Sequence, residues 1–319
     1  MSSITLVTAT SFMRSASLRA ELEEGLRDLP GSVQAHYLDL REISARTLLM
    51  DPLFAARVTS WLVGGEAVGE AELEGLPNLK RVSKYGVGLD NIDFKACQAR
   101  GVSVHFEAGV NSMAVAEHTL GLIIGMMRNI NNNSNKLRLG VWNKDGGRGL
   151  SGMKVGLVGL GHVGSKVAGL LKMLGADITY TELEDKFVEE KSLNIRRLSF
   201  DDLLSSNELL SFHVPLTDQT YKMMNERAFQ KARDGLYLVN TSRGQVIDEK
   251  ALKIALKSGK VRGAALDVFE NEPLHDKELA ESEKLIGTPH TAGNSEQAVK
   301  AMGQAAIRGI LSHYKILGP

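Results

Sequence analysis

Residues 154–164, KVGLVGLGHVG, constrain the fold of this chain more than any other stretch. An apolar run breaks there into Gly159, Gly161 and Gly164, and an amphipathic helical pattern follows. An apolar strand, a G-x-G-x-x-G turn and a helix suit a dinucleotide pyrophosphate, because glycines let the backbone approach it and the helix N-terminus supplies amides and a positive dipole. Glycine turns also serve plain helix–strand packing, so the motif alone leaves both interpretations open.

A carboxylate after the next strand favours the cofactor interpretation. Residues 177–181 form an apolar strand pattern that ends at Glu182, 18 residues beyond Gly164. About 20 residues past the last glycine, an acid accepts hydrogen bonds from the adenosine ribose hydroxyls of NAD. Its negative charge disfavours NADP, whose 2′-phosphate is itself an anion. A surface glutamate at a strand end is the remaining alternative.

The composition excludes several classes of protein. The chain has 319 residues, enough for two domains, since single cores rarely exceed roughly 250 residues. Lys and Arg together number 38, as do Asp and Glu, so there is neither a basic footprint for nucleic acid nor a polybasic membrane anchor. The single cysteine, Cys97, rules out an internal disulfide framework. No basic region precedes the first apolar run, and no apolar run approaches the ~20 residues of a membrane span, so we expect a cytoplasmic protein.

The first hundred residues predict a separate α/β layer structure. Short apolar runs alternate there with helical patterns, which is typical of a parallel sheet covered by helices. The expected strands are residues 4–7, 33–38, 60–63, 79–83 and 102–105. The fourth leads into a glycine-punctuated loop, residues 84–93, whose backbone amides suit a carboxylate. A tight turn capped by Asp90 is the alternative.

A long helix is expected from residue 113 to about residue 130, with Asn111 and Ser112 offering N-cap side chains. It is apolar on most sides, so it must be buried between layers or subunits. The polar, glycine-rich residues 131–150 are predicted to form a loop that leads into the second domain.

The last helix, expected from residue 295 to about residue 314, follows the final strand of the second sheet. A complete sheet leaves it no place there, so we expect it to cross back to the first domain. One domain is therefore predicted at 1–108 plus 295–319, and the other at 109–294.

The second domain is expected to contain a six-stranded doubly wound sheet. Polar residues follow the carboxyl ends of four of its strands. These strands are expected at residues 209–214, 235–240, 262–266 and 284–288. Ligands of open α/β sheets bind beyond the carboxyl ends of the strands, so the tips should converge on the cofactor crevice. The convergence carries the argument, because Arg243, Glu272 and His290 taken singly are typical surface or loop residues.

With these residues placed, the chain resembles the D-isomer-specific 2-hydroxyacid dehydrogenases of the short, phosphoglycerate dehydrogenase-like form. The similarity runs from about residue 79 to residue 293 and is strongest in residues 240–273, NTSRGQVIDEKALKIALKSGKVRGAALDVFENEP. The resemblance implies a flavodoxin-like substrate domain and a Rossmann NAD-binding domain with a cleft between them. It also implies a cytoplasmic homodimer with NAD as cofactor and no metal.

The resemblance assigns roles to individual residues. Arg243 is implied to bind substrate, Glu272 to pair with His290, and His290 to be the general acid/base. The implied cofactor-binding residues are Gly159, Gly161, His162, Val163, Gly164, Glu182, His213, Pro215, Thr241 and Asp267, the last through the nicotinamide carboxamide. The implied substrate-binding residues are Lys84, Tyr85, Gly86, Val87, Gly88 and Asn111.

These roles fit the chemistry of a 2-keto acid. Its reduction requires hydride at the carbonyl carbon and a proton at the carbonyl oxygen, and histidine carries a proton near neutral pH. A neighbouring Glu272 carboxylate should raise the pKa of His290. Arg243 offers a planar fork to the carboxylate and carbonyl oxygens of the substrate.

Two departures from the family pattern stand out. Many members carry Asn-x-Pro-Gly before the hinge helix, where residues 107–111 here are EAGVN, so the first hinge is expected to differ in shape. Formate dehydrogenase relatives carry glutamine at Glu272, which argues against formate as substrate.

Other functions remain open at this point. A phosphite dehydrogenase uses the same Arg, Glu and His set, and an NAD-sensing corepressor-like scaffold keeps these residues too. A methyltransferase shares the glycine turn and the acid, but leaves the three strand-tip residues unexplained. The sequence does not identify the 2-hydroxy acid, because Lys80, Arg81 and Lys84 fit either a second anionic group or a solvated surface.

Overall fold

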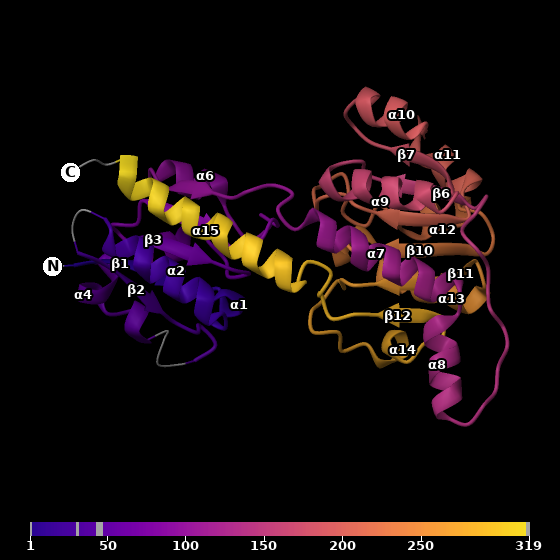
Figure 1. The fold of residues 1–319 in the computed structure, drawn as a ribbon, viewed down its shortest axis with the longest axis horizontal. Helices are drawn as coiled ribbons and strands as arrows, with labels where there is room; N and C mark the ends of the chain where they lie inside the picture. Colours follow the sequence, from indigo (N-terminus) through magenta and orange to yellow (C-terminus); the bar gives the residue numbers. More distant parts are fainter. Residues whose placement is uncertain (1, 30–31, 43–46, 317–319) are drawn as a thin grey trace. The chain divides into compact units, whose positions relative to one another are not determined.

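The computed structural model describes residues 2–29, 32–42 and 47–316. The chain forms two compact units, one of residues 1–111 and 294–319 and the other of residues 112–293 (Figure 1). We call them unit 1 and unit 2.

Unit 1 contains a five-stranded parallel sheet in the order β2-β1-β3-β4-β5. Its strands are β1 (Ser3–Val7), β2 (Val33–Tyr37), β3 (Val58–Val63), β4 (Arg81–Lys84) and β5 (Ser103–His105). Its described helices are α1 (Thr10–Met13), α2 (Ala16–Arg27), α4 (Pro52–Ala55), α5 (Glu70–Gly75), α6 (Phe94–Ala99) and α15 (Glu296–Ile316). This is the strand order of flavodoxin-like sheets.

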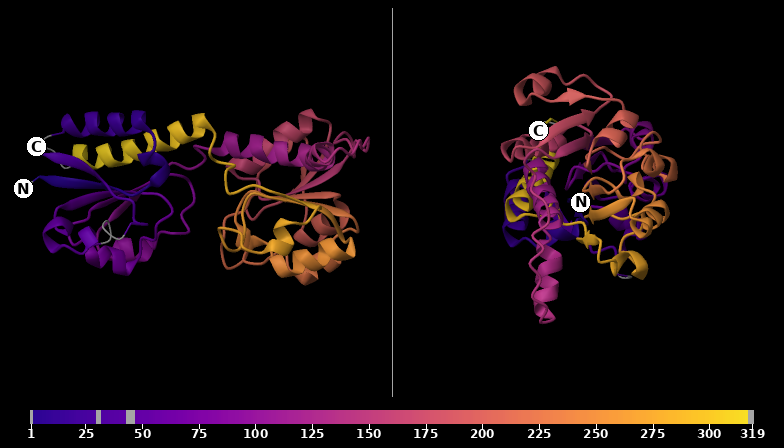
Figure 2. Two further views of the ribbon diagram at one scale, coloured as in Figure 1. Left: turned by 90° about the horizontal axis from the view of Figure 1, so that it is seen from below. Right: turned by 90° about the vertical axis from the view of Figure 1, so that its right-hand side faces the viewer.

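Helices cover both faces of this sheet. Ser15 caps α2 by accepting a hydrogen bond from the Leu18 amide, and α2 buries one apolar face against the sheet. The C-terminal helix α15 lies beside α2 on the same face and packs on β4 (Figures 1 and 2). The opposite core holds apolar residues of α4, α5 and α6, including the buried Cys97.

Unit 2 contains a seven-stranded parallel sheet in the order β12-β11-β10-β9-β6-β7-β8. Its strands are β6 (Lys154–Val158), β7 (Asp177–Thr181), β8 (Arg196–Arg197), β9 (Leu209–Phe212), β10 (Leu236–Asn240), β11 (Val261–Leu266) and β12 (Leu285–Gly287). Its helices are α7 (Ser112–Met127), α8 (Ile130–Arg138), α9 (His162–Met173), α10 (Phe187–Leu193), α11 (Phe200–Ser206), α12 (Glu226–Lys231), the 3-10 turn η1 (Gly244–Val246), α13 (Glu249–Ser258) and α14 (Lys277–Ala280).

Two apolar layers enclose the sheet of unit 2. The apolar helix α7 packs against α9 on one face, with Ile123 and Met127 almost fully buried. α11, α12 and α13 pack on the other face, which buries Leu203, Phe229 and Leu252. The two doubly wound parallel sheets confirm the expected flavodoxin-like and Rossmann fold classes.

The expectation of six strands in the second sheet was wrong. A seventh strand, β8, pairs with β7 through Arg196 and Arg197. Because this strand has only two residues and both are arginines, no apolar run marks it in the sequence.

The expectation of a loop at residues 131–150 was also wrong in its first part. α7 ends at Met127, Asn129 adopts a left-handed φ of 52°, and a second helix, α8, follows. No residue of α8 is buried, so the apolar periodicity that usually reveals a helix is missing from its sequence. Across residues 2–29, 32–42 and 47–316, no helix combines the length and hydropathy needed to cross a membrane.

Candidate active site

The three glycines after β6 have different surroundings. Gly159 has a φ of 96°, and a Cβ there would lie 2.7 Å from the carbonyl oxygen of His213. A Cβ at Gly164 would collide with the carbonyl oxygen of Gly159. Gly161, at the N-cap of α9, faces open space with no heavy atom within 4 Å of such a Cβ. Two glycines therefore serve the turn and its packing, and the third leaves room for a ligand at a helix N-terminus.

Glu182 follows β7 and turns back to this glycine turn. Its Oε2 accepts a hydrogen bond from the Leu160 amide at 2.9 Å, and its Oε1 accepts one from the Leu183 amide at 2.8 Å. The acid is thus fixed beside the turn, where the ribose hydroxyls of a bound dinucleotide require an acceptor. These residues fit NAD.

His213, Pro215 and Thr241 lie at the tips of β9 and β10. Burial lowers the pKa of His213 to about 3, so its ring is neutral at physiological pH. Its Nε2 lies 2.9 Å from Ser211 Oγ, and its buried Nδ1 has no hydrogen-bond partner among the described residues. Pro215 is exposed, whereas Thr241 is buried with its hydroxyl 2.8 Å from that of Thr119 on α7.

A histidine–carboxylate pair lies at the tips of β11 and β12. His290 Nδ1 lies 2.8 Å from Glu272 Oε2, and the other carboxylate oxygen accepts from the Phe269 amide at 3.1 Å. About half of the His290 side chain is exposed, so its ring remains accessible. The backbone of His290 has a φ of 52°, which non-glycine residues rarely adopt.

Each member of this pair favours the charged form of the other. The hydrogen bond to Glu272 raises the pKa of His290 above its ordinary value, although partial burial and the charge of Arg243 oppose the rise. Burial opposes ionisation of Glu272, but the hydrogen bond and charge of His290, the Phe269 amide and Arg243 together lower its pKa. The raised pKa of His290 is the direction expected from the sequence.

Arg243 follows β10 on a loop that packs against the segment carrying Glu272. Its carbonyl accepts from Asn240 Nδ2 at 2.8 Å, and its Nη1 donates to the Ser242 carbonyl at 2.7 Å. The adjacent Gly244 leaves no room for a Cβ, because that atom would collide with the backbone of Phe269. The charge of Arg243 acts on both Glu272 and His290.

Asp267 is buried and serves the loop that carries His290. Its Oδ1 accepts from Thr288 Oγ1 at 2.6 Å and from the Thr291 amide at 2.8 Å, and its Oδ2 accepts from the Ala292 amide at 2.9 Å. His118 of α7 reaches the same group, with its Nε2 3.1 Å from Thr288 Oγ1. Sequence reasoning placed Thr288 at a strand tip but missed its contact with His118, because no motif connects a helix residue to a strand tip 170 positions away.

The loop after β4 in unit 1 is ordered by its own lysine. Lys84 is buried, and its ammonium donates to the Gly64 carbonyl and to Asn91 Oδ1, the latter at 2.8 Å. Gly86 has a φ of 108°, and residues 86–88 are partly exposed. Burial raises the pKa of Tyr85 to about 12, and the Tyr85 hydroxyl and Asn111 Oδ1 are buried without hydrogen-bond partners among the described residues.

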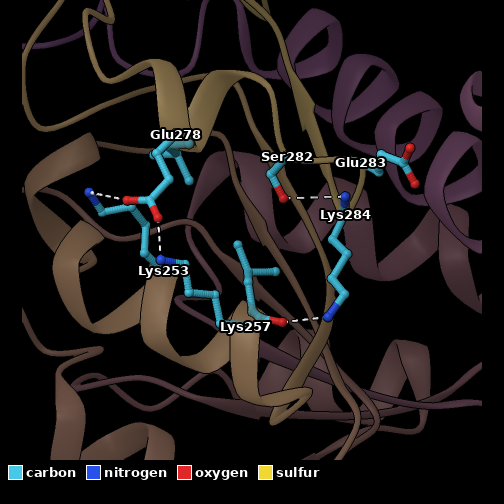
Figure 3. Close-up of a pocket in the computed structure, with 8 residues that line it drawn as sticks. Lys253, Lys257, Glu278, Ser282, Glu283 and Lys284 are labelled. Atoms are coloured by element: carbon cyan, nitrogen blue, oxygen red, sulfur yellow. Dashed lines mark hydrogen bonds and ion pairs between the residues drawn. The ribbon is translucent and has the colours of Figure 1, made fainter.

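A surface pocket elsewhere in unit 2 does not belong to this site. Figure 3 shows Lys253, Lys257 and Lys284 lining it beside Glu278, between α13, α14 and β12. Glu278 forms ion pairs with the first two lysines, and Lys284 donates to the carbonyl of Leu256. The described residues include no cluster of His, Cys, Asp and Glu that could hold a metal ion.

Comparisons with known proteins identify the family of this chain. The model of the NAD-binding domain of D-isomer-specific 2-hydroxyacid dehydrogenases matches residues 120–292. The chain is 38% identical over 251 residues to a glyoxylate reductase of Thermofilum pendens, covering 76% of this chain and 74% of that protein. It is 37% identical over 245 residues to a D-3-phosphoglycerate dehydrogenase of Mycobacterium leprae, covering 76% and 46%.

Solved structures extend the similarity to the whole fold. A D-lactate dehydrogenase of Aquifex aeolicus, crystallised with NAD and lactic acid, matches with a TM-score of 0.82 and 26% identity over 98% of this chain and 95% of that one. The family model itself covers more than half of the residues. The chain therefore belongs to the D-isomer-specific 2-hydroxyacid dehydrogenases and carries their NAD-binding domain in unit 2.

Proposed function

We propose that this protein interconverts a D-2-hydroxy acid and its 2-keto acid with NAD(H), using His290 as general acid/base, Glu272 as its partner and Arg243 as the substrate-binding residue. The observation that carries the proposal is the 2.8 Å contact of His290 with Glu272, with the charge of Arg243 acting on both, in the unit that matches the family's NAD-binding domain. Bound NADH supplies the hydride for the carbonyl carbon.

The proton for the carbonyl oxygen comes from His290. Its Nδ1 donates to Glu272, so Nε2 of the imidazolium is the nitrogen that protonates the developing alkoxide. Glu272 fixes the orientation of the ring and stabilises its positive charge. In the direction of oxidation, Nε2 of the neutral ring accepts the hydroxyl proton.

Arg243 and the cofactor residues position the reactants. The planar guanidinium of Arg243 pairs with the carboxylate of the substrate and polarises its carbonyl oxygen. The open space at Gly161 and the amides at the start of α9 receive the pyrophosphate, and Glu182 accepts from the ribose hydroxyls. Asp267, proposed to contact the nicotinamide carboxamide, also supports this arrangement through the loop that it organises.

Residues 1–108 with 295–319 form the substrate domain in this proposal. The partly exposed backbone of residues 86–88, held in place by Lys84, presents amides to the substrate carboxylate. The two buried polar atoms without partners, on Tyr85 and Asn111, are further candidates for contact with substrate.

The protein also acts as a homodimer in this proposal. Five large apolar side chains in and after α8 are exposed: Ile130, Leu137, Leu139, Val141 and Trp142. Clustered apolar exposure of this kind marks an interaction surface, and a second copy of the chain is the occupant proposed.

The decisive experiment combines the protein with NADH and a panel of 2-keto acids: glyoxylate, hydroxypyruvate, pyruvate and phosphohydroxypyruvate. We expect NADH to be consumed with at least one of them, and His290→Ala to abolish turnover while NADH affinity is kept. If His290→Ala turns over normally, the acid/base assignment is wrong. Reduction of NAD by phosphite, or NADH binding with negligible turnover of every acid, would instead support a phosphite dehydrogenase or a corepressor-like scaffold.

A further inference from the structure

A chain of polar contacts joins helix α7 to the loop that carries His290. His118 Nε2 lies 3.1 Å from Thr288 Oγ1 and 3.5 Å from Asp267 Oδ1, and the Thr288 hydroxyl lies 2.6 Å from the same carboxylate oxygen. All three residues belong to unit 2. The proposed reaction assigns no role to His118.

The direction of these hydrogen bonds follows from the available protons. Thr288 has a single hydroxyl hydrogen, and the short contact with the carboxylate of Asp267 uses it. The Thr288 oxygen is therefore left as an acceptor for His118, so Nε2 of His118 must carry a hydrogen and donate it. The resulting order is His118 to Thr288 to Asp267.

Asp267, the last residue in this series of hydrogen bonds, fixes the backbone on both sides of His290. Asp267 accepts from the amides of Thr291 and Ala292, and its own carbonyl accepts from the His290 amide at 2.8 Å. His290 has a left-handed φ of 52° between these fixed points. A non-glycine residue keeps such a conformation only where the surrounding structure over-determines it.

We propose that His118 is a positioning residue for the reaction: its hydrogen bond to Thr288 braces the 288–292 loop, so that His290 keeps its backbone conformation and its contact with Glu272. This inference rests on the proposed function, since it assumes that His290 transfers the proton. α7 begins unit 2 and the 288–292 loop ends it, so the brace also joins the two segments through which the chain enters and leaves this unit.

Three variants of the full chain test the brace. His118→Ala removes the donor, His118→Gln keeps an N–H donor in the same region of space, and Glu117→Ala changes the exposed neighbour on the same helix. We expect His118→Ala to lower kcat with the best keto acid roughly tenfold to hundredfold, as small misplacements of catalytic groups do, while the Kd for NADH is kept. In His118→Ala, kcat/KM for keto-acid reduction should also begin to fall at a lower pH than in the wild type. The reason is that a weaker contact with Glu272 leaves the pKa of His290 lower. Gln should restore most of kcat, and Glu117→Ala should behave as wild type.

Amide hydrogen exchange at residues 288–292 provides a readout that does not depend on turnover. We expect faster exchange at Thr291 and Ala292 in His118→Ala and wild-type exchange in His118→Gln. If the wild type reduces no keto acid, the proposed function fails, and the exchange rates still decide on the brace. Wild-type exchange, kcat and pH profile in His118→Ala would overturn the inference, as would a Gln variant as impaired as Ala or equal damage from Glu117→Ala.

Discussion

At the scale of single residues, the proposed chemistry depends on the pair of His290 and Glu272. A histidine alone would titrate near pH ~6.5. The carboxylate 2.8 Å away raises the pKa of His290, so the imidazolium persists to higher pH. Arg243 opposes the rise in the pKa of His290, so the proposed substrate-binding group also limits how far the acid is weakened.

Exchange of the carboxylate for an amide tests this coupling. Reduction requires the imidazolium, so kcat/KM should fall as pH rises through the pKa of His290. In Glu272→Gln the largest cause of the raised pKa is lost, and the falling limb should move to lower pH. The pH profile of kcat/KM for keto-acid reduction measures this, with circular dichroism as the control for folding. An unmoved limb would show that Glu272 does not set the acidity of His290.

At the scale of elements, the turn between β6 and α9 contains glycines needed for packing and one, Gly161, that we propose is needed for the cofactor. Gly164 packs against the carbonyl of Gly159, whereas a Cβ at Gly161 would meet nothing. Gly169, further along α9, also faces open space within the described residues. The same substitution at these three sites therefore has three different physical effects.

Three alanine variants distinguish these effects by thermal unfolding and NADH titration. Gly164→Ala should lower stability by roughly 1–3 kcal/mol, because the backbone must move to admit the methyl group. Gly161→Ala should fold as well as wild type but bind NADH more weakly, because the methyl group occupies the approach of the pyrophosphate. Gly169→Ala, the control, should raise stability by up to about 1 kcal/mol with unchanged NADH affinity. Wild-type affinity in Gly161→Ala would place the pyrophosphate elsewhere.

At the scale of the whole molecule, the chain builds unit 1 from both of its ends. α15 packs on β4 and α2, although more than 200 residues separate each of them in sequence from the start of α15. Unit 2 is one continuous segment, and it carries the exposed apolar side chains after α7. Trp142, one of these side chains, is 77% exposed. The fold of a single chain therefore leaves this apolar surface uncovered.

Light scattering tests whether a second copy covers this surface. We expect the wild type to be a dimer, and Leu139→Ser with Trp142→Ser to shift it towards monomer while NADH binding is kept. Leu53→Ser is the matched control, because Leu53 is 74% exposed in unit 1 and its loss should leave the dimer intact. A monomeric wild type would refute the proposal, and an unaffected double variant would place the interface on another surface.

The sequence by itself determined the two parallel sheets, the glycine turn and the acid after β7, because these depend on local periodicity and fixed spacing. Only the tertiary structure decided what those residues touch. It showed that both carboxylate oxygens of Asp267 accept hydrogen bonds from the loop that carries His290. It also showed that the Lys84 ammonium orders the loop after β4, and that His118 lies beside Thr288. It also revealed β8 and α8, which are too short or too polar to leave an apolar signal. Contacts between distant residues depend on how elements pack, and no local pattern records that packing.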